Sequence, residues 1–171
     1  IPIGKNPVIL VIKKNKSILE NLIDWLASNT NSKEIDGQIK LCGVPTLIID
    51  DEADSASVNT TSSKKDKAQA LEDVKTINKL IRTLLNLFEK NTFIGYTATP
   101  YANLFIPQEW SETKEALVRG KKYKVGEDLF PRDFIINIRA AKNYIGAAKF
   151  FGLENPVTGI STEPLDIFRS I

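Results

Sequence analysis

Histidine and methionine are absent from this 171-residue chain, and cysteine occurs only once, at Cys42. Without histidine, the chain has no His-ligated zinc site and no Ser-His or Cys-His catalytic pair, which excludes most hydrolase mechanisms. A single cysteine rules out an internal disulfide framework and fits the reducing cytoplasm. No apolar run approaches the roughly 20 residues of a membrane-spanning helix, and the first residues show no signal-peptide pattern. We therefore expect a cytoplasmic protein with no membrane partner.

Neither basic nor acidic residues are in large excess. The 23 basic and 21 acidic residues nearly cancel, so any contact with nucleic acid must come from a local patch. A hydrophobic content of 42% over this length is enough for one packed domain. The chain begins at Ile1 without methionine and stops at Ile171 in mid-pattern, so we expect it to be part of a longer protein.

Short apolar runs rich in β-branched residues predict the strands. They are bounded by polar segments and have strand length, as expected when both faces of a strand are covered. The four predicted strands are Pro7–Lys13, Val44–Asp50, Phe93–Thr97 and Phe134–Ile138.

Apolar residues at spacings of three and four predict the helices. The clearest pattern lies in residues 68–90, and a second lies in residues 17–28, where Ser17 and Glu20 fit a capping box. Shorter helical stretches are expected at residues 113–119 and 144–151.

Strands that alternate with helices predict an α/β domain with a mostly parallel sheet, in which the long helix joins the second strand to the third. We expect one domain over residues 1–171, with a polar loop at 55–67 and an irregular insertion at 101–133.

Two of the predicted strands end in polar residues, in the strings TLIIDDEAD and TFIGYTATP. Ligands of parallel sheets lie beyond the carboxyl ends of the strands. Asp51 is suited to hold a magnesium ion through its water shell, and Glu52 to orient or deprotonate an attacking water. We expect the hydroxyls of Thr97 and Thr99 to hydrogen-bond Asp54 or Glu52.

These residues also carry a resemblance. Asp51-Glu52-Ala53-Asp54 looks like the DEAD form of motif II of superfamily 2 helicases and translocases, and Thr97-Ala98-Thr99-Pro100 looks like their motif III. Pro7–Asn15 is similar in place to motif Ia. The resemblance implies a RecA-like P-loop NTPase core that uses ATP and Mg²⁺. It also implies that Thr97 and Thr99 couple the nucleotide site to nucleic-acid binding.

The motif Ia position implies contact of Lys13, Lys14 and Asn15 with the nucleic-acid backbone, with DNA the favoured partner. A short lysine cluster is also typical of a solvated loop, and this alternative stays open. Lys64, Lys65 and Lys67 in the polar loop have the same two interpretations.

A closer resemblance is to the Z1 domain family, described as candidate endonucleases of bacterial defence and restriction systems. The strings that carry it are IIDDEADSASVNT, GYTATPYANLF and LFPRDFIINI. It implies part of a helicase-like ATPase of a bacterial restriction or defence protein. Asn143 and Tyr144 match family positions, without an assigned chemistry.

The sequence departs from the helicase pattern in one respect. It contains no G-x-x-x-x-G-K-[ST] loop, and Gly4-Lys5 lacks both the upstream glycine and the following Ser or Thr. The family pattern places this Walker A segment before Ile1 and a second RecA-like lobe elsewhere in the same protein. We therefore expect the intact protein to hydrolyse ATP and this chain alone to be inactive.

Two alternatives belong to other classes. The first is a magnesium-dependent endonuclease in which Asp50, Asp51 and Glu52 bind the metal and Glu72–Lys75 imitates part of a nuclease signature. The lysine of such a signature usually follows its acidic residue along a strand, whereas Lys75 lies in a predicted helix. The second alternative is a non-catalytic interaction module that keeps an ATPase-like shape.

Overall fold

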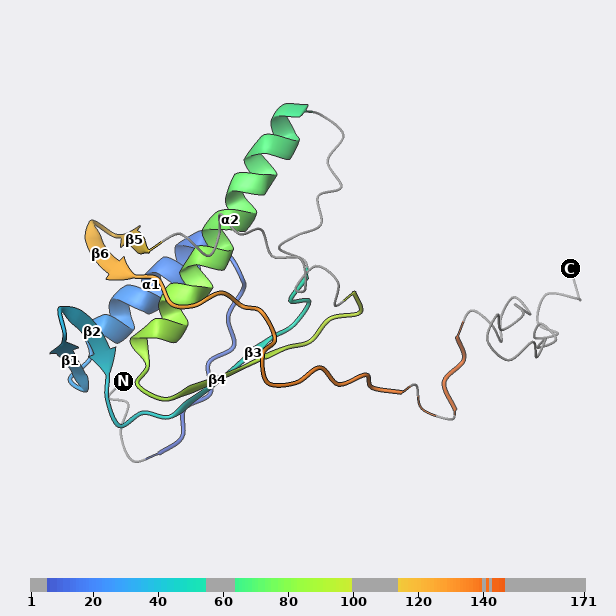
Figure 1. The fold of residues 1–171 in the computed structure, drawn as a ribbon, viewed down its shortest axis with the longest axis horizontal. Helices are drawn as coiled ribbons and strands as arrows, with labels where there is room; N and C mark the ends of the chain where they lie inside the picture. Colours follow the sequence, from blue (N-terminus) through green and yellow to red (C-terminus); the bar gives the residue numbers. More distant parts are fainter. Residues whose placement is uncertain (1–5, 55–63, 100–113, 140, 142, 147–171) are drawn as a thin grey trace, which may run out of the picture. The chain divides into compact units, whose positions relative to one another are not determined.

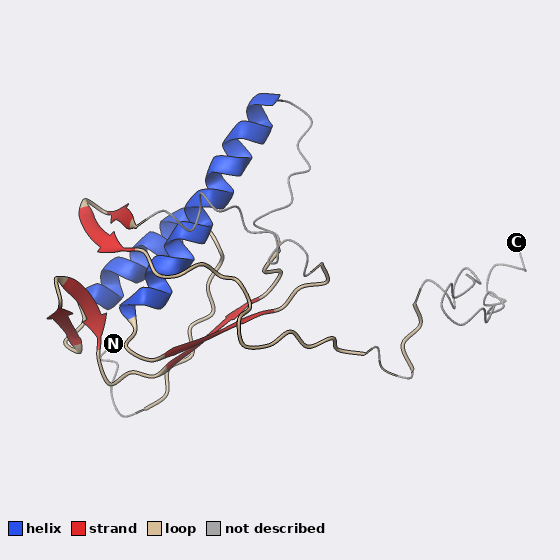
Figure 2. Cartoon of the chain, in the orientation of Figure 1, coloured by secondary structure: helices blue, strands red, loops and turns tan. Residues whose placement is uncertain are grey.

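The computed structural model describes residues 6–54, 64–99, 114–139, 141 and 143–146. The chain divides into two compact units, residues 1–132 and 133–171. In the described part of the first unit, two helices accompany three pairs of strands (Figures 1 and 2). In chain order these are α1 (Lys16–Ala27), β1 (Ser32–Ile35), β2 (Gln38–Leu41), β3 (Thr46–Asp50), α2 (Lys64–Leu87), β4 (Asn91–Gly95), β5 (Glu115–Val118) and β6 (Lys121–Lys124).

Helix α1 begins where an asparagine caps it. The side-chain oxygen of Asn15 accepts a hydrogen bond from the amide of Ile18 at 2.9 Å, and asparagine is as good an N-cap as serine. The predicted capping box at Ser17 and Glu20 was therefore wrong, because a suitable cap occurs earlier in the chain. The buried face of α1 consists of Leu19, Ile23 and Leu26.

Helix α2 packs against α1 and supplies much of the core. Its buried apolar residues join those of α1 and of the β2 and β5–β6 strands in one cluster, which includes Leu41, Leu80, Ile81, Leu84, Phe88 and Val118. Neither helix in the described part of the chain is long and apolar enough to cross a bilayer.

The buried face of α2 also carries Arg82, which is only 2% exposed. Its guanidinium donates to the carbonyl oxygens of Gly126 and Glu127 at distances of 2.8 to 3.1 Å. Burial lowers the pKa of Arg82, since desolvation disfavours the charged form. A buried charge thus ties the segment after β6 to α2.

Strands β3 and β4 form a parallel pair in which Ile48 is opposite Phe93 and Asp50 is opposite Gly95. Helix α2 lies between them in the sequence. The predicted parallel pairing of these two strands, joined by the long helix, is therefore confirmed. The strand from Asn91 begins and ends two residues earlier than the sequence pattern indicated.

The expected RecA-like core with a mostly parallel sheet was wrong. The described residues form three separate two-stranded sheets, and only the β3–β4 sheet is parallel. The predicted strand at Pro7–Lys13 is not formed: Ile9 is 88% and Val11 is 93% exposed. The predicted strand at Phe134–Ile138, in the second unit, is not formed either.

Two hairpins lie where the sequence was interpreted otherwise. Their turns, Asp36-Gly37 and Arg119-Gly120, have positive φ at both residues, the geometry that closes a two-residue hairpin. The first lies in a stretch taken as merely polar. The second replaces the short helix expected near residues 113–119, so the described part of the 101–133 insertion contains regular structure.

Two further expectations fall partly outside the described residues. Within the 55–67 polar loop, residues 64–67 belong to α2, and residues 55–63 are not described. Within the helical stretch expected at 144–151, residues 144–146 are not helical, and residues 147–151 are not described.

Candidate functional site

The parallel pairing of β3 and β4 brings their two polar ends together. Beyond the strands, the amide of Tyr96 donates to the carbonyl of Asp50 at 2.8 Å, and the amide of Ala53 donates to the carbonyl of Tyr96 at 2.9 Å. These bonds continue the ladder into the residues that follow both strands. We call residues 51–54 the acidic turn and residues 96–99 the threonine turn.

The acidic turn lies close to Gly95, the last residue of β4. A Cβ atom at this position would lie 2.9 Å from the Cβ of Ala53, which is closer than two carbon atoms can pack. Glycine is therefore required here by the approach of the acidic turn. The small side chain of Ala53 is required for the same reason.

A side-chain hydrogen bond joins the turns directly. The hydroxyl of Thr99 donates to Oδ2 of Asp54, and the amide of Thr99 donates to the hydroxyl oxygen of Thr97 at 2.9 Å. Hydrogen bonds from Thr97, and next from Thr99, lower the pKa of Asp54, because they favour the ionised carboxylate. The hydrogen bonding expected between the threonines and Asp54 is confirmed, while the coupling role of these residues stays a prediction.

Asp51 and Glu52 lie at the exposed tip of the acidic turn. Oδ1 of Asp51 accepts a hydrogen bond from the amide of Glu52 at 3.0 Å. Glu52 has a left-handed backbone with φ of 50°, which is uncommon for a residue other than glycine. The two carboxylates assigned to chemistry therefore face solvent on a sharply turned backbone.

Lys14 enters the site from a distant part of the sequence. Its ammonium lies 2.8 Å from Oδ1 of Asp50, 3.2 Å from the carbonyl oxygen of Asp51 and 2.9 Å from that of Glu52. No local sequence signal indicates this contact, because 36 residues separate the lysine from Asp50. From the sequence, Lys14 was expected either to contact nucleic acid or to lie in a solvated loop.

The three residues assigned to nucleic-acid contact thus have different surroundings. Lys13 is exposed, Lys14 binds Asp50 and the acidic turn, and the side-chain oxygen of Asn15 caps α1. A contact with phosphate needs an exposed side chain, and of the three residues Lys13 is the exposed one.

The carboxylates of the acidic turn fit magnesium only through its water shell. Among the described residues, no group of three acidic or cysteine side chains is placed to hold a metal ion. Magnesium in phosphate-transfer sites keeps several waters and needs only one or two carboxylates besides the substrate phosphates. Asp51, which is exposed and has one oxygen bonded to an amide, is suited to that role.

The geometry gives less support to a nuclease centre. The carboxylate of Asp50 is paired with Lys14, so its charge is already balanced. Glu72 and Lys75 lie on α2, whereas the lysine of a nuclease signature usually follows its acidic residue along a strand.

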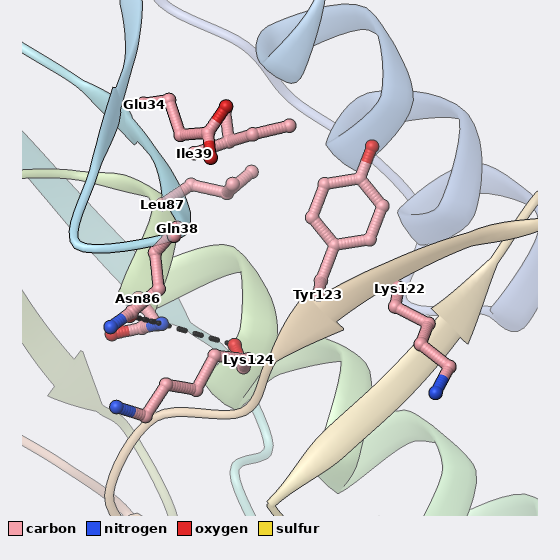
Figure 3. Close-up of a pocket in the computed structure, with 9 residues that line it drawn as sticks. Glu34, Gln38, Ile39, Asn86, Leu87, Lys122, Tyr123 and Lys124 are labelled. Atoms are coloured by element: carbon pink, nitrogen blue, oxygen red, sulfur yellow. Dashed lines mark hydrogen bonds between the residues drawn. The ribbon is translucent and has the colours of Figure 1, made fainter.

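A separate pocket of about 230 Å³ lies between the β1–β2 hairpin, the end of α2 and strand β6 (Figure 3). None of the residues assigned to function from the sequence lines it. Tyr123 lies at its centre, with its hydroxyl directed away from Asn86 and Lys124. That hydroxyl is buried without a hydrogen-bond partner among the described residues. Burial raises the pKa of Tyr123.

The chain matches no family model, no curated protein and no solved structure.

Proposed function

We propose that this chain supplies the hydrolytic and coupling residues of an ATP-dependent nucleic-acid translocase, of the helicase-like type, that acts in bacterial restriction or defence. The observation that carries the proposal is the hydrogen bond between Thr99 and Asp54. It links the threonine turn to the turn that presents Asp51 and Glu52, as coupling between two sites requires. The resemblance of both turns to helicase motifs supports the same function.

Each carboxylate of the acidic turn has a separate role in this proposal. Bound magnesium would balance the charge of the nucleotide phosphates. Asp51 holds the water shell of that ion. Glu52 orients the attacking water and accepts its proton, a role that depends chiefly on correct placement. Asp54 already accepts a hydrogen bond from Thr99. In this proposal it therefore links the two turns and takes no part in the hydrolysis itself.

The nucleotide phosphates need a second set of ligands. The sequence has no glycine-rich phosphate loop of the P-loop type, and Lys14, a half-buried cation at the site, is engaged by the acidic turn. In the proposed protein, other segments supply the phosphate loop. The chain alone should therefore show no ATP turnover above background.

The nucleic-acid partner, with DNA favoured, would contact the exposed side of the segment before α1. Lys13, and Lys16 at the start of α1, are exposed and would neutralise backbone phosphates, giving a salt-dependent, sequence-independent contact.

The variant Glu52→Gln tests the proposal in the intact protein. Because an amide keeps the shape of the side chain but cannot accept the proton, ATP hydrolysis should fall on the order of 10²-fold or more, while nucleotide binding is retained. Glu115→Gln is the matched control, since Glu115 is an exposed acid on β5. Equal turnover in Glu52→Gln and the wild type would exclude Glu52 from the chemistry.

A further inference from the structure

We propose that Lys14 is a positioning residue that holds the acidic turn in its left-handed conformation, and that it is not a nucleic-acid contact. Its ammonium has three oxygen acceptors, contributed by Asp50, Asp51 and Glu52, within 2.8 to 3.2 Å. An ammonium has three N–H donors. The contacts with Asp50 and with the acidic turn therefore use the full donor capacity of Lys14 and leave none for a phosphate.

The burial of this pair favours a fixed contact over a passing one. The side chain of Lys14 is 22% exposed and that of Asp50 is 12% exposed. Withdrawing the lysine toward a nucleic acid would leave the carboxylate of Asp50 largely buried without a counter-charge, which is costly. Exposed ion pairs elsewhere in the chain, such as that between Lys122 and Glu115, have no such constraint.

The contact with Lys14 lies at a backbone conformation that is unusual for a residue other than glycine, the positive φ of Glu52. Three described residues other than glycine have positive φ. Asp36 and Arg119 are each followed by glycine in a hairpin turn, whereas Glu52 is followed by Ala53. Strained backbone persists only where its surroundings fix it, and here Lys14 binds the carbonyl oxygens of Asp51 and Glu52, which belong to the two peptide groups on either side of the Glu52 Cα.

Lys14 is itself held firmly. The next residue, Asn15, caps α1 through its side chain, and the amide of Leu19 donates to the Asn15 carbonyl at 3.0 Å. Leu19 is buried in the core. The lysine therefore joins the start of a packed helix to the acidic turn, and Lys13, which is exposed, has no equivalent contact with that turn.

Hydrogen exchange of the full 171-residue chain tests this role without reference to activity. Each amide exchanges according to its local opening, and the Ala53 amide, bonded to the Tyr96 carbonyl, reports on the acidic turn. In Lys14→Met it should exchange about 10-fold faster or more, as expected when charge-assisted bonds are lost. Lys13→Met is the matched control and should leave the Ala53 rate unchanged.

A double variant covers the case in which Lys14→Met unfolds the chain. Lys14→Met with Asp50→Asn removes the unpaired charge, so exchange in α1 and α2 should return to the wild-type rate. The Ala53 amide should still exchange fast, because the carbonyl oxygens of Asp51 and Glu52 have lost their donor. Wild-type protection of Ala53 in this double variant would overturn the proposal.

Binding to duplex DNA at several salt concentrations tests the competing role. The proposal predicts an unchanged salt slope for Lys14→Met. A slope reduced by about one, as for a lost phosphate contact, together with unchanged Ala53 exchange, would overturn it.

The consequence for catalysis rests on the proposed function. In the intact protein, Lys14→Met should lower kcat for ATP with little change in KM, because Glu52 is misplaced while substrate binding is kept. A higher KM with an unchanged kcat would contradict a positioning role for Lys14. If the wild-type protein hydrolyses no ATP, the proposed function fails, but the exchange result still decides the role of Lys14.

Discussion

Thr99 donates its hydroxyl hydrogen to the carboxylate of Asp54, across 45 residues of sequence. The bond spans the ends of two adjacent parallel strands and joins the turn that presents Asp51 and Glu52 to the turn that follows β4. In the proposed function, a change at the threonine turn would alter the placement of the acidic residues without either threonine touching a ligand.

The titration of Asp54 should report this bond. Its pKa lies below the ordinary value of 3.8, with Thr97 as the larger cause and Thr99 as the second. We expect Thr97→Ala to raise the pKa of Asp54 toward 3.8, and Thr99→Ala to raise it less. Carboxyl carbon NMR over the acidic range measures both shifts.

The lowered pKa also fixes the sign of the pH dependence. A carboxylate whose pKa is depressed on folding adds stability above its unfolded pKa and loses it as pH falls through the folded value. The stability contributed by the ionised carboxylate of Asp54 should thus be present at pH 5 and be lost only below 3.8. Thr92→Ala, which removes a hydroxyl elsewhere on β4, should change neither the titration nor this pH range.

The close approach of Ala53 to Gly95 gives a second prediction. In Gly95→Ala the new methyl group would lie 2.9 Å from the Cβ of Ala53, so the acidic turn must move. Overpacking of this kind costs about 1–3 kcal/mol, measurable as a lower free energy of unfolding in urea. Ala53→Gly in the same chain should restore much of that loss, and a failure of this rescue would show that the two residues are not in contact.

A third prediction concerns the buried hydroxyl of Tyr123, which has no hydrogen-bond partner among the described residues. An unsatisfied buried polar group is destabilising, so Tyr123→Phe should increase the free energy of unfolding by about 1 kcal/mol. Calorimetry or urea unfolding at neutral pH measures this change. A destabilised Tyr123→Phe variant would mean that the hydroxyl has a partner in solution.

The same residue predicts an alkaline effect. Burial raises the pKa of Tyr123 above 10.0, and a group whose pKa is raised on folding adds stability below its unfolded pKa that is lost as pH rises through the folded value. The stability difference between Tyr123→Phe and the wild type should therefore grow above pH 10. A difference that stays constant with pH would contradict burial of the phenol.

The elements that the sequence predicted best are those with a strong local pattern. Apolar spacing was enough to predict α2 and much of α1, and the two β-branched runs that became β3 and β4 were correctly paired as parallel strands. The hydrogen bonding between Asp54 and the threonines could be predicted from that pairing, because parallel strands bring their carboxyl ends to one edge of the sheet.

The errors arose where composition was used in place of pairing. The run at Pro7–Lys13 has strand composition but no hydrogen-bonded neighbour, and a strand exists only through its partner. The Asp36-Gly37 pair is typical of a two-residue hairpin turn, but the segment before it, Ser32–Ile35, lacks the alternating apolar residues that indicate a flanking strand. The contact of Lys14 with the acidic turn had no local signal, since it depends on tertiary packing alone.

The central claim is that the Thr99–Asp54 bond couples nucleotide hydrolysis to nucleic-acid binding. The most direct measurement is the ATP hydrolysis rate of the intact protein against DNA concentration, for the wild type, Thr99→Ala and the control Thr92→Ala. The account predicts that Thr99→Ala keeps most of its basal rate and DNA affinity but loses stimulation by DNA, by several-fold for a coupling of about 1 kcal/mol. Full stimulation in Thr99→Ala would contradict the claim.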